Sequence, residues 1–191
     1  MKKLKFVCFF CIFLIFAAGC AKPPIAEMDS AKEAVTRAEN DADAVLYGGS
    51  SLARARNALK MMQAEADSKR YEAAKTHASE AIAAADKAIA DGKTGAARAR
   101  DEAASLLSGL GPAIEETGKG INAARSANLA LDYPELEQEL SGARRDRDQA
   151  ETALLDSNYQ TAMEKGVNAR GTISDINQKL TNATMIVSRK K

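Results

Sequence analysis

The fold is decided by the stretch Tyr71-Glu-Ala-Ala-Lys-Thr-His-Ala-Ser-Glu-Ala-Ile-Ala-Ala-Ala-Asp-Lys-Ala-Ile-Ala90. Apolar residues recur in it at alternating steps of four and three, and charged residues occupy the positions between them. This spacing places the apolar residues on one face of an α-helix. The residues that we expect to face inward are Ala74, Ala78, Ala81, Ala85 and Ala88, with Ile82 and Ile89 beside them. The predicted helix therefore buries a stripe made mostly of alanine.

Two further helices are predicted before this stretch. The first carries the stripe Val35, Ala38, Ala42 and Val45. Ser30 to Glu33 has the form of a capping box at its start, although the helix can begin a turn earlier, and Gly48-Gly49 ends it. The second, which Ser50 or Ser51 can cap, has the coiled-coil seam spacing of Leu52, Ala55, Leu59, Met62 and Ala66. Residues 67–70 read as a tight turn before Tyr71.

The same pattern returns later in the chain. With a shift of 88 residues, Leu52, Ala55, Met62, Ala66, Tyr71, Ala74, Ala81 and Ala85 become Leu140, Ala143, Ala150, Leu154, Tyr159, Ala162, Ala169 and Ile173. Upstream the shift is 86, so we expect the loop after Tyr133 to be two residues longer than its counterpart. Leu59 corresponds to Arg147, which predicts looser packing there or an arginine that reaches the surface.

The boundary between the two units is predicted at Gly109-Leu110-Gly111-Pro112, because two glycines and a proline disfavour a continuous helix. Gly92 and Gly95 are ambiguous, and we expect the helix to continue through them. The first unit then covers residues 30–108 and the second residues 112–191. The predicted fold is all-α, with elongated antiparallel helical hairpins or a bundle built from two related three-helix units.

The composition points to a thin core. Alanine accounts for 39 of the 191 residues, there is no tryptophan, and all five phenylalanines lie in residues 1–20. Alanine lets helices approach closely, but each residue buries little apolar area. A walled internal pocket is therefore not expected.

The first twenty residues have the organisation of a lipoprotein signal peptide. Lys2, Lys3 and Lys5 form a basic region, and the apolar run of residues 6–16 is too short to cross a bilayer. Residues 17–20, Ala-Ala-Gly-Cys, resemble the bacterial lipobox. The resemblance implies that residues 1–19 are removed, that Cys20 is lipidated, and that residues 20–29 form the lipidated N-terminus and stem.

Residue 21 is an alanine, which resembles the outer-membrane sorting signal of lipoproteins rather than the inner-membrane one. The expected location is thus the periplasmic side of the outer membrane. Removing residues 1–19 leaves 24 basic and 26 acidic residues. This balance gives no reason to expect nucleic acid as a partner, and it assigns membrane attachment to acyl chains.

The remaining residues offer little catalytic chemistry. His77 is the only histidine, and Gly118-Lys119-Gly120 lacks the spacing of a phosphate-binding loop. The carboxylates alternate with cations and are interpreted as solvated helix faces; examples are Glu33, Glu39, Asp41, Asp43, Glu135, Glu137 and Glu139. We therefore expect no enzyme activity, no cofactor and no metal site.

The four tyrosines recur in equivalent places. Tyr47 and Tyr133 are expected at the end of a first helix, and Tyr71 and Tyr159 at the start of a third. A tyrosine ring can plug the end of an alanine seam while its hydroxyl reaches a loop carbonyl. We interpret all four as structural tyrosines rather than as ligand-stacking groups.

The run from Ala34 to Ala90 resembles an alanine-rich helical domain of unknown function that recurs in bacterial envelope lipoproteins. The residues that carry the resemblance are Ala38, Tyr47, Leu52, Ala53, Arg54, Ala55, Leu59, Tyr71, Ala74 and Ala78. The second unit matches more weakly, through Leu140, Ala143, Tyr159 and Ala162. The resemblance implies a helical, membrane-anchored envelope protein and supplies no activity.

The end of the chain resembles the tail of murein lipoproteins. Residues 177–182, Asn-Gln-Lys-Leu-Thr-Asn, are followed by Arg189-Lys190-Lys191, but Ser188 and an extra lysine depart from that pattern. The resemblance implies that the Lys191 amine can be linked to peptidoglycan. The alternative is a basic helix end that complements the helix dipole.

Three functional interpretations follow. The leading one is a non-enzymatic lipoprotein that acts as a structural scaffold or adaptor in the periplasm. The alternatives are a peptidoglycan tether through Lys191 and an accessory subunit of an envelope complex that binds peptides or lipids along a groove. The latter predicts an exposed apolar surface. A further possible partner is a second copy of this chain, because self-association could complete the alanine seams.

Overall fold

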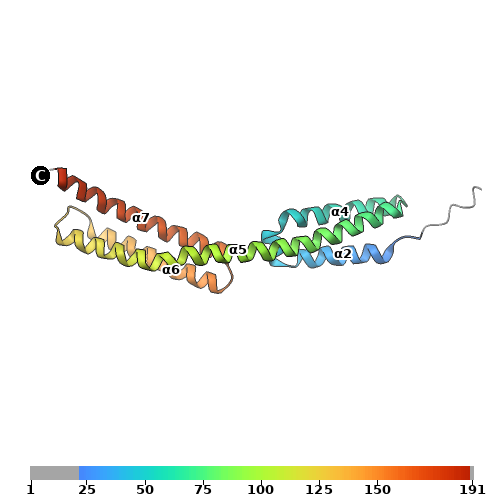
Figure 1. The fold of residues 1–191 in the computed structure, drawn as a ribbon, viewed down its shortest axis with the longest axis horizontal. Helices are drawn as coiled ribbons and strands as arrows, with labels where there is room; N and C mark the ends of the chain where they lie inside the picture. Colours follow the sequence, from blue (N-terminus) through green and yellow to red (C-terminus); the bar gives the residue numbers. More distant parts are fainter. Residues whose placement is uncertain (1–21, 190–191) are drawn as a thin grey trace, which may run out of the picture. The chain divides into compact units, whose positions relative to one another are not determined.

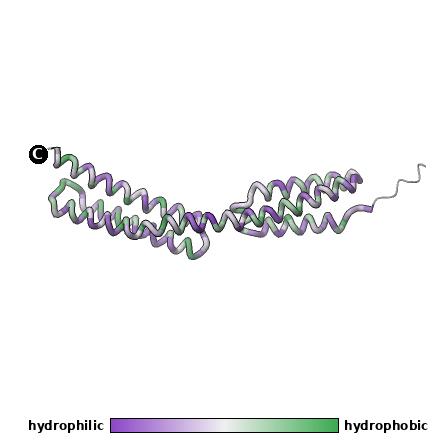
Figure 2. Tube along the Cα trace, viewed as in Figure 1, coloured by the Kyte–Doolittle hydropathy of each residue, from purple (hydrophilic) through white to green (hydrophobic). Residues whose placement is uncertain are grey.

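The structure, a computed structural model, describes residues 22–189. Six α-helices and no strand occur in this range, so the predicted all-α fold is confirmed. Hydrophobic and hydrophilic residues alternate along the helices, as amphipathic packing requires (Figure 2). The signal peptide, Cys20 and Lys191 lie outside the described residues. Within them, no helix combines the length and the apolar character that a membrane crossing needs.

The chain divides into two compact units between Lys93 and Thr94. The first unit contains α2 (Ile25–Glu39), α3 (Ala42–Tyr47), α4 (Gly49–Asp67) and the beginning of α5 (Tyr71–Ser126). In Figure 1, α2 and α4 flank this part of α5. The core is dominated by alanine, and its residues are Met28, Ala31, Ala34, Val35, Ala38, Ala44, Leu52, Ala55, Met62, Ala78, Ala81, Ala84, Ala85 and Ala88.

The second unit contains the rest of α5 with α6 (Tyr133–Leu155) and α7 (Tyr159–Arg189). Its main core uses more leucine and isoleucine than the first, namely Leu107, Leu110, Ile114, Ile121, Leu136, Leu140, Ala143, Ala150, Ala169, Ile173 and Ile176. Arg147 is 29% exposed and pairs with Asp148 at 2.5 Å and with Glu151 at 3.8 Å. Of the two alternatives predicted for Arg147, the structure thus shows the arginine that reaches the surface.

The two units share burial patterns at the predicted shifts. With the shift of 86, the buried residues Pro24, Met28, Ala31, Val35 and Ala38 match the buried residues Leu110, Ile114, Thr117, Ile121 and Ala124. With the shift of 88, Lys69 (φ 58°) matches Ser157 (φ 60°). Both residues close the preceding helix with the same pair of backbone hydrogen bonds, in the manner of a Schellman motif.

One prediction about α5 is confirmed and another is wrong. The helix continues through Gly92 and Gly95, as expected, but it also continues through Gly109-Leu110-Gly111-Pro112. Pro112 lies on the exposed side, whereas the flanking residues Leu110 and Ile114 are only 2% exposed. Packing of the buried side therefore holds the helix together where proline removes one backbone hydrogen bond.

Several predicted helix ends are also wrong. The first helix begins at Ile25, in line with the earlier start that the sequence also allows. It does not run on to Gly48-Gly49 but is interrupted at Asn40, after which Asp41 accepts a hydrogen bond from the Ala44 amide at 2.8 Å. α4 begins at Gly49 with Gly48 as N-cap, so neither Ser50 nor Ser51 caps it. Serine side chains favour a helix start because they can cap the first turn, but packing decides where the helix ends lie.

The position of Tyr133 needs a similar correction. Tyr47 ends α3 as predicted, but Tyr133 begins α6 instead of ending a helix. The residues between Ser126 and Tyr133 form the connection, and Asp132 caps α6 by accepting a hydrogen bond from the Glu135 amide at 3.0 Å. The longer connection therefore precedes the tyrosine.

Two glycines in the first unit allow backbones to touch. A Cβ at Gly92 would lie 2.5 Å from the Ala44 nitrogen, and a Cβ at Gly48 would lie 2.2 Å from the Ala88 oxygen. Both contacts are with backbone atoms, which cannot rotate away. The contact between α3 and α5 therefore requires glycine at these two positions.

We predict that Gly92→Ala lowers the free energy of unfolding by about 2 kcal/mol or more, because the added methyl overlaps the α3 backbone. Gly109→Ala is the matched control in the same helix, since nothing lies within 4 Å of its Cβ position. That change should raise stability by about 0.5–1 kcal/mol through helix propensity. Urea unfolding followed by circular dichroism measures both. Equal effects of the two substitutions would contradict the close contact.

Candidate functional site

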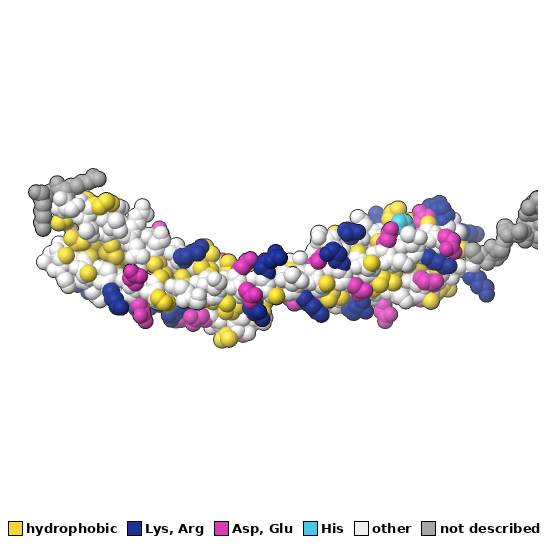
Figure 3. All heavy atoms as spheres, viewed as in Figure 1, with side chains coloured by type: hydrophobic (Ala, Val, Ile, Leu, Met, Phe, Trp, Pro, Cys, Tyr) yellow, Lys and Arg dark blue, Asp and Glu magenta, His cyan; other side chains and the backbone are white. Residues whose placement is uncertain are grey.

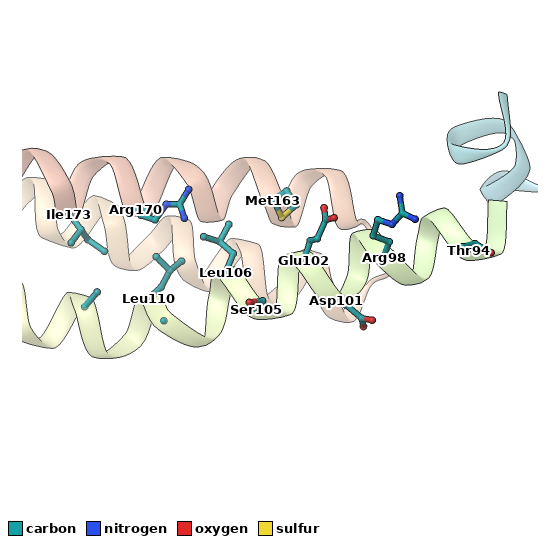
Figure 4. A pocket seen from close by; sticks show the side chains of 12 residues that line it. Thr94, Arg98, Asp101, Glu102, Ser105, Leu106, Leu110, Met163, Arg170 and Ile173 are labelled. Carbon is teal, nitrogen blue, oxygen red and sulfur yellow. The ribbon is translucent and has the colours of Figure 1, made fainter. Parts of the chain in front are cut away.

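An open groove runs along α5 and α7 in the second unit. Its volume is about 930 Å³. α5 lines it from Thr94 to Ala113, and α7 lines it from Met163 to Ile173. Figure 4 shows side chains from both helices directed into the space between them. The groove is open to solvent. It therefore does not conflict with the expectation, drawn from the composition, that the protein has no walled internal pocket.

The floor of the groove is apolar. Leu110 and Ile173 are buried, and the half-exposed side chains of Leu106 and Met163 lie beside them (Figure 4). Gly109 leaves open space where a side chain would stand. The floor therefore offers apolar contact without a protruding ridge.

Gly166 explains how close the two helices come under the groove. A Cβ at Gly166 would lie 2.7 Å from Leu106 Cδ2 and 3.4 Å from Leu107 Cδ2. The leucine side chains of α5 therefore rest directly on the backbone of α7 at this level. Leu107 turns into the core, while Leu106 borders the groove.

Charged side chains border the groove. Arg98, Glu102 and Arg170 line it and form no ion pair with another side chain in residues 22–188. Asp101 is different, because the guanidinium of Arg100 donates to it at 2.8 and 3.0 Å, and this bond raises the pKa of Arg100. The border thus presents two guanidinium groups and one carboxylate for contacts with a partner.

Tyr133 has the structural role that the sequence predicts. Its hydroxyl donates to the Leu129 carbonyl at 2.7 Å, and the Arg125 guanidinium lies 5.0 Å from the ring centroid. Arg125 also pairs with Glu137 at 2.6 Å. The ring therefore fastens the connection between α5 and α6 to the start of α6.

The other three tyrosines lie at helix ends. Tyr47 is the last residue of α3, Tyr71 the first of α5 and Tyr159 the first of α7. All three rings are half-buried. None of the four tyrosines lines the groove.

His77 and the carboxylates named in the sequence analysis as the nearest to catalytic chemistry include residues that form pairs at the surface. His77 Nδ1 lies 2.8 Å from Glu80, and Glu39 accepts from Arg56 at 2.7 Å. Among residues 22–188, no three His, Cys, Asp or Glu side chains gather as metal ligands would. On the face seen in Figure 3, Lys and Arg are interspersed with Asp and Glu, as the balanced composition predicts.

Two polar links across helices were not foreseen from the sequence. In the first unit, the Ser51 hydroxyl, whose residue is 3% exposed, donates to Asp91 at 2.6 Å. In the second unit, Lys179 donates to Glu139 at 2.7 Å. With the shift of 88, Ser51 corresponds to Glu139 and Asp91 to Lys179. The duplicated position therefore has a polar link in both units, but a serine–aspartate hydrogen bond in the first is replaced by a lysine–glutamate ion pair in the second.

These links also shift acid–base properties. Hydrogen bonds from Lys87 and then Ser51 hold the pKa of Asp91 below its ordinary value. Hydrogen bonds to Glu139 and then Glu135 raise the pKa of Lys179. Both shifts favour the charged forms, as hydrogen bonds to a charged group do. For Asp91 the larger effect comes from Lys87 one turn away in the same helix, and only the Ser51 hydroxyl links it to another helix.

One sequence signal could have located the groove. Leu106 and Leu107 are adjacent, and neighbouring side chains point about 100° apart around an α-helix. When the buried stripe is narrow, one of two adjacent leucines therefore lies at its edge, and here Leu107 is buried while Leu106 is half-exposed. Arg98 and Arg170 carry no signal of their own, because isolated arginines are common on helix surfaces.

We predict that Tyr133→Phe lowers the free energy of unfolding by about 1 kcal/mol, because the Leu129 carbonyl loses its hydrogen bond. Tyr71→Phe is the matched control, since the Tyr71 hydroxyl has no hydrogen bond within the described residues. It should change stability by clearly less. Chemical unfolding of both variants provides the measurement, and a larger loss for the control would refute the structural role of the Tyr133 hydroxyl.

No protein-family model, curated protein or solved structure matches this chain. The functional proposal therefore rests on the residues of the chain and on the geometry described above.

Proposed function

We propose that the protein is a non-enzymatic, lipid-anchored adaptor of the bacterial envelope that faces the periplasm. The groove of the second unit carries the adaptor part, since it joins an open apolar floor to two unpaired guanidinium groups. The lipobox that ends at Cys20 supports the anchor, and Ala21 favours the outer membrane. The resemblance to envelope lipoproteins agrees with this assignment.

The occupant that best fits the groove is one amphipathic helix of a partner protein. Leu106, Leu110 and Ala113 recur at steps of four and three along α5, so they form the row that a helix packs against. Gly109 and Ala113 leave room for a close approach. An apolar helix face laid into such a groove is a common mode of recognition.

The charges of the border point to acidic residues on that helix. Arg98 and Arg170 offer guanidinium forks that bind carboxylates well. Such border charges mainly set the association rate and the choice of partner, whereas the apolar floor supplies most of the affinity. A second copy of this chain, a lipid and peptidoglycan are the competing occupants.

The anchor is tested first. We expect Cys20→Ala to move the protein from the membrane fraction to the soluble fraction, because acyl chains contribute about 0.8 kcal/mol per buried methylene. Cys11→Ala is the control, since that cysteine lies in the apolar run that is removed with the signal peptide. Fractionation of cells followed by immunoblotting measures the change. Retention of the Cys20→Ala protein in the membrane would refute the anchor.

The groove is tested by photo-crosslinking in cells. A photoreactive residue at Ser105, which lines the groove, should form an adduct that the same residue at Ser108, outside the lining, does not form. Mass spectrometry should map the adduct to an amphipathic helix rich in Asp or Glu. Arg98→Glu with Arg170→Glu should lower the yield about tenfold or more, as expected for opposed charges. Changing the mapped acids to lysine should restore it.

The alternative occupants give distinct results in this experiment. Adducts to the same chain indicate self-association, and adducts to lipid or peptidoglycan indicate those ligands. Either result, or equal adducts at Ser105 and Ser108, would refute a partner helix in the groove.

A further inference from the structure

We infer that one end of the first unit rests on the surface of the phospholipid bilayer. This end comprises the start of α2 at Ile25, the turn of residues 68–70 and the start of α5 at Tyr71, and we call it the lipid-facing end. The inference rests on the proposed lipidation of Cys20. Beyond the anchor itself, the inference states which surface of the protein meets the membrane and in which direction the helices leave the membrane.

The tether between lipid and bundle is very short. Pro24 is already buried against the first unit, and its carbonyl accepts a hydrogen bond from the Met28 amide at 3.0 Å. Only three residues separate Cys20 from Pro24. Even a fully extended chain spans at most about 3.6 Å per residue, so Pro24 lies within about 14 Å of the lipidated cysteine.

Ion pairs fix which parts of the unit share this level. Glu39 of α2 pairs with Arg56 of the antiparallel α4 at 2.7 Å, and counting fourteen residues along each helix brings Ile25 level with Arg70. Arg37 pairs with Asp86 of α5 at 2.7 Å, which brings Ile25 near the first turn of α5. Figure 1 shows the start of α2 and the connection from α4 to α5 at the same end of this unit.

The exposed chemistry of this end suits a headgroup layer. The Ile25 side chain is 64% exposed. Lys22 and Lys69 are exposed and form no ion pair in the described residues, so they can approach lipid phosphates. The half-buried ring of Tyr71 is of the kind enriched at membrane interfaces.

Charge alone would not hold this surface on a membrane. The turn also carries Asp67, and Arg70 is engaged with Glu65 through a hydrogen bond of 2.9 Å. That pairing raises the pKa of Arg70 and lowers the pKa of Glu65. The acyl chains therefore provide the affinity, and the lipid-facing end determines the orientation. α4 then leads away from the bilayer, and Ser50 lies about 27 Å from Ser68 along the helix axis.

The orientation can be measured with single tryptophans, because the chain contains none. Ser68→Trp places the probe at the lipid-facing end, and Ser50→Trp places it at the opposite end of α4. Both serines are exposed, and neither side chain makes a hydrogen bond within the described residues. The acylated protein is inserted into vesicles of phosphatidylethanolamine and phosphatidylglycerol that contain phosphatidylcholine with a nitroxide on its headgroup.

We expect the headgroup nitroxide to quench the fluorescence of the Ser68→Trp protein at least about twofold more than that of the Ser50→Trp protein, given their separation along α4. Equal quenching, or stronger quenching of the Ser50→Trp protein, would overturn the inference. Far-ultraviolet circular dichroism and urea unfolding check that both variants keep the helical fold.

A second arm separates this inference from the proposed anchor. Residues 20–191 are produced without acylation and coupled through the Cys20 thiol to a maleimide-bearing phospholipid in the same vesicles. If cells do not acylate Cys20, the anchor proposal fails, but this arm still compares the two tryptophans at the same tether length. If acylation is found and both arms show equal quenching, the anchor stands and the lipid-facing end is wrong.

Discussion

Close approach of helix backbones is the constraint on which the first unit depends. The Ala44 nitrogen and the Ala88 oxygen lie where side chains at Gly92 and Gly48 would have to stand. Alanine along the rest of the seam keeps the helices near each other over their whole length. Because each alanine buries little area, cohesion comes from many small contacts rather than from a few large residues. The second unit relaxes this constraint over part of its seam, because Ile173 and Ile176 stand where the first unit has Ala85 and Ala88.

Such thin seams give polar links more weight in fixing how helices pair. Ser51 with Asp91 and Glu139 with Lys179 occupy matching positions forty residues apart in the chain. One Glu139 oxygen is buried without a hydrogen bond within the described residues, so the hydrogen-bonding capacity of this carboxylate is only partly satisfied. A link of this type adds little net stability, but it opposes sliding of one helix past its neighbour. The duplicated position thus preserves helix register although its residues differ.

The sequence predicts helices well where periodicity is long and the turn chemistry is local. The start of α5 at Tyr71, its continuation through Gly92 and the turn of residues 67–70 needed no tertiary information. The failures at Ser50 and Pro112 have one cause, since local signals favoured ends that packing overrides. The groove was missed for a different reason. It arises from the distance between two helices whose facing residues, such as Leu106 and Gly166, lie sixty residues apart in the chain. Periodicity within one helix does not describe that distance.

The repeat itself explains why Pro112 lies inside a helix and where the α5 side of the groove comes from. With the shift of 86, residues 109–112 correspond to residues 23–26, where α2 begins after two prolines. The second unit therefore retains the composition of a helix start, but α5 arrives there already helical. Residues 94–108 of α5 correspond by the same shift to residues 8–22, all of which precede α2. The α5 side of the groove is thus built largely from a segment outside the duplicated helices, which is why the repeat in the sequence does not predict it.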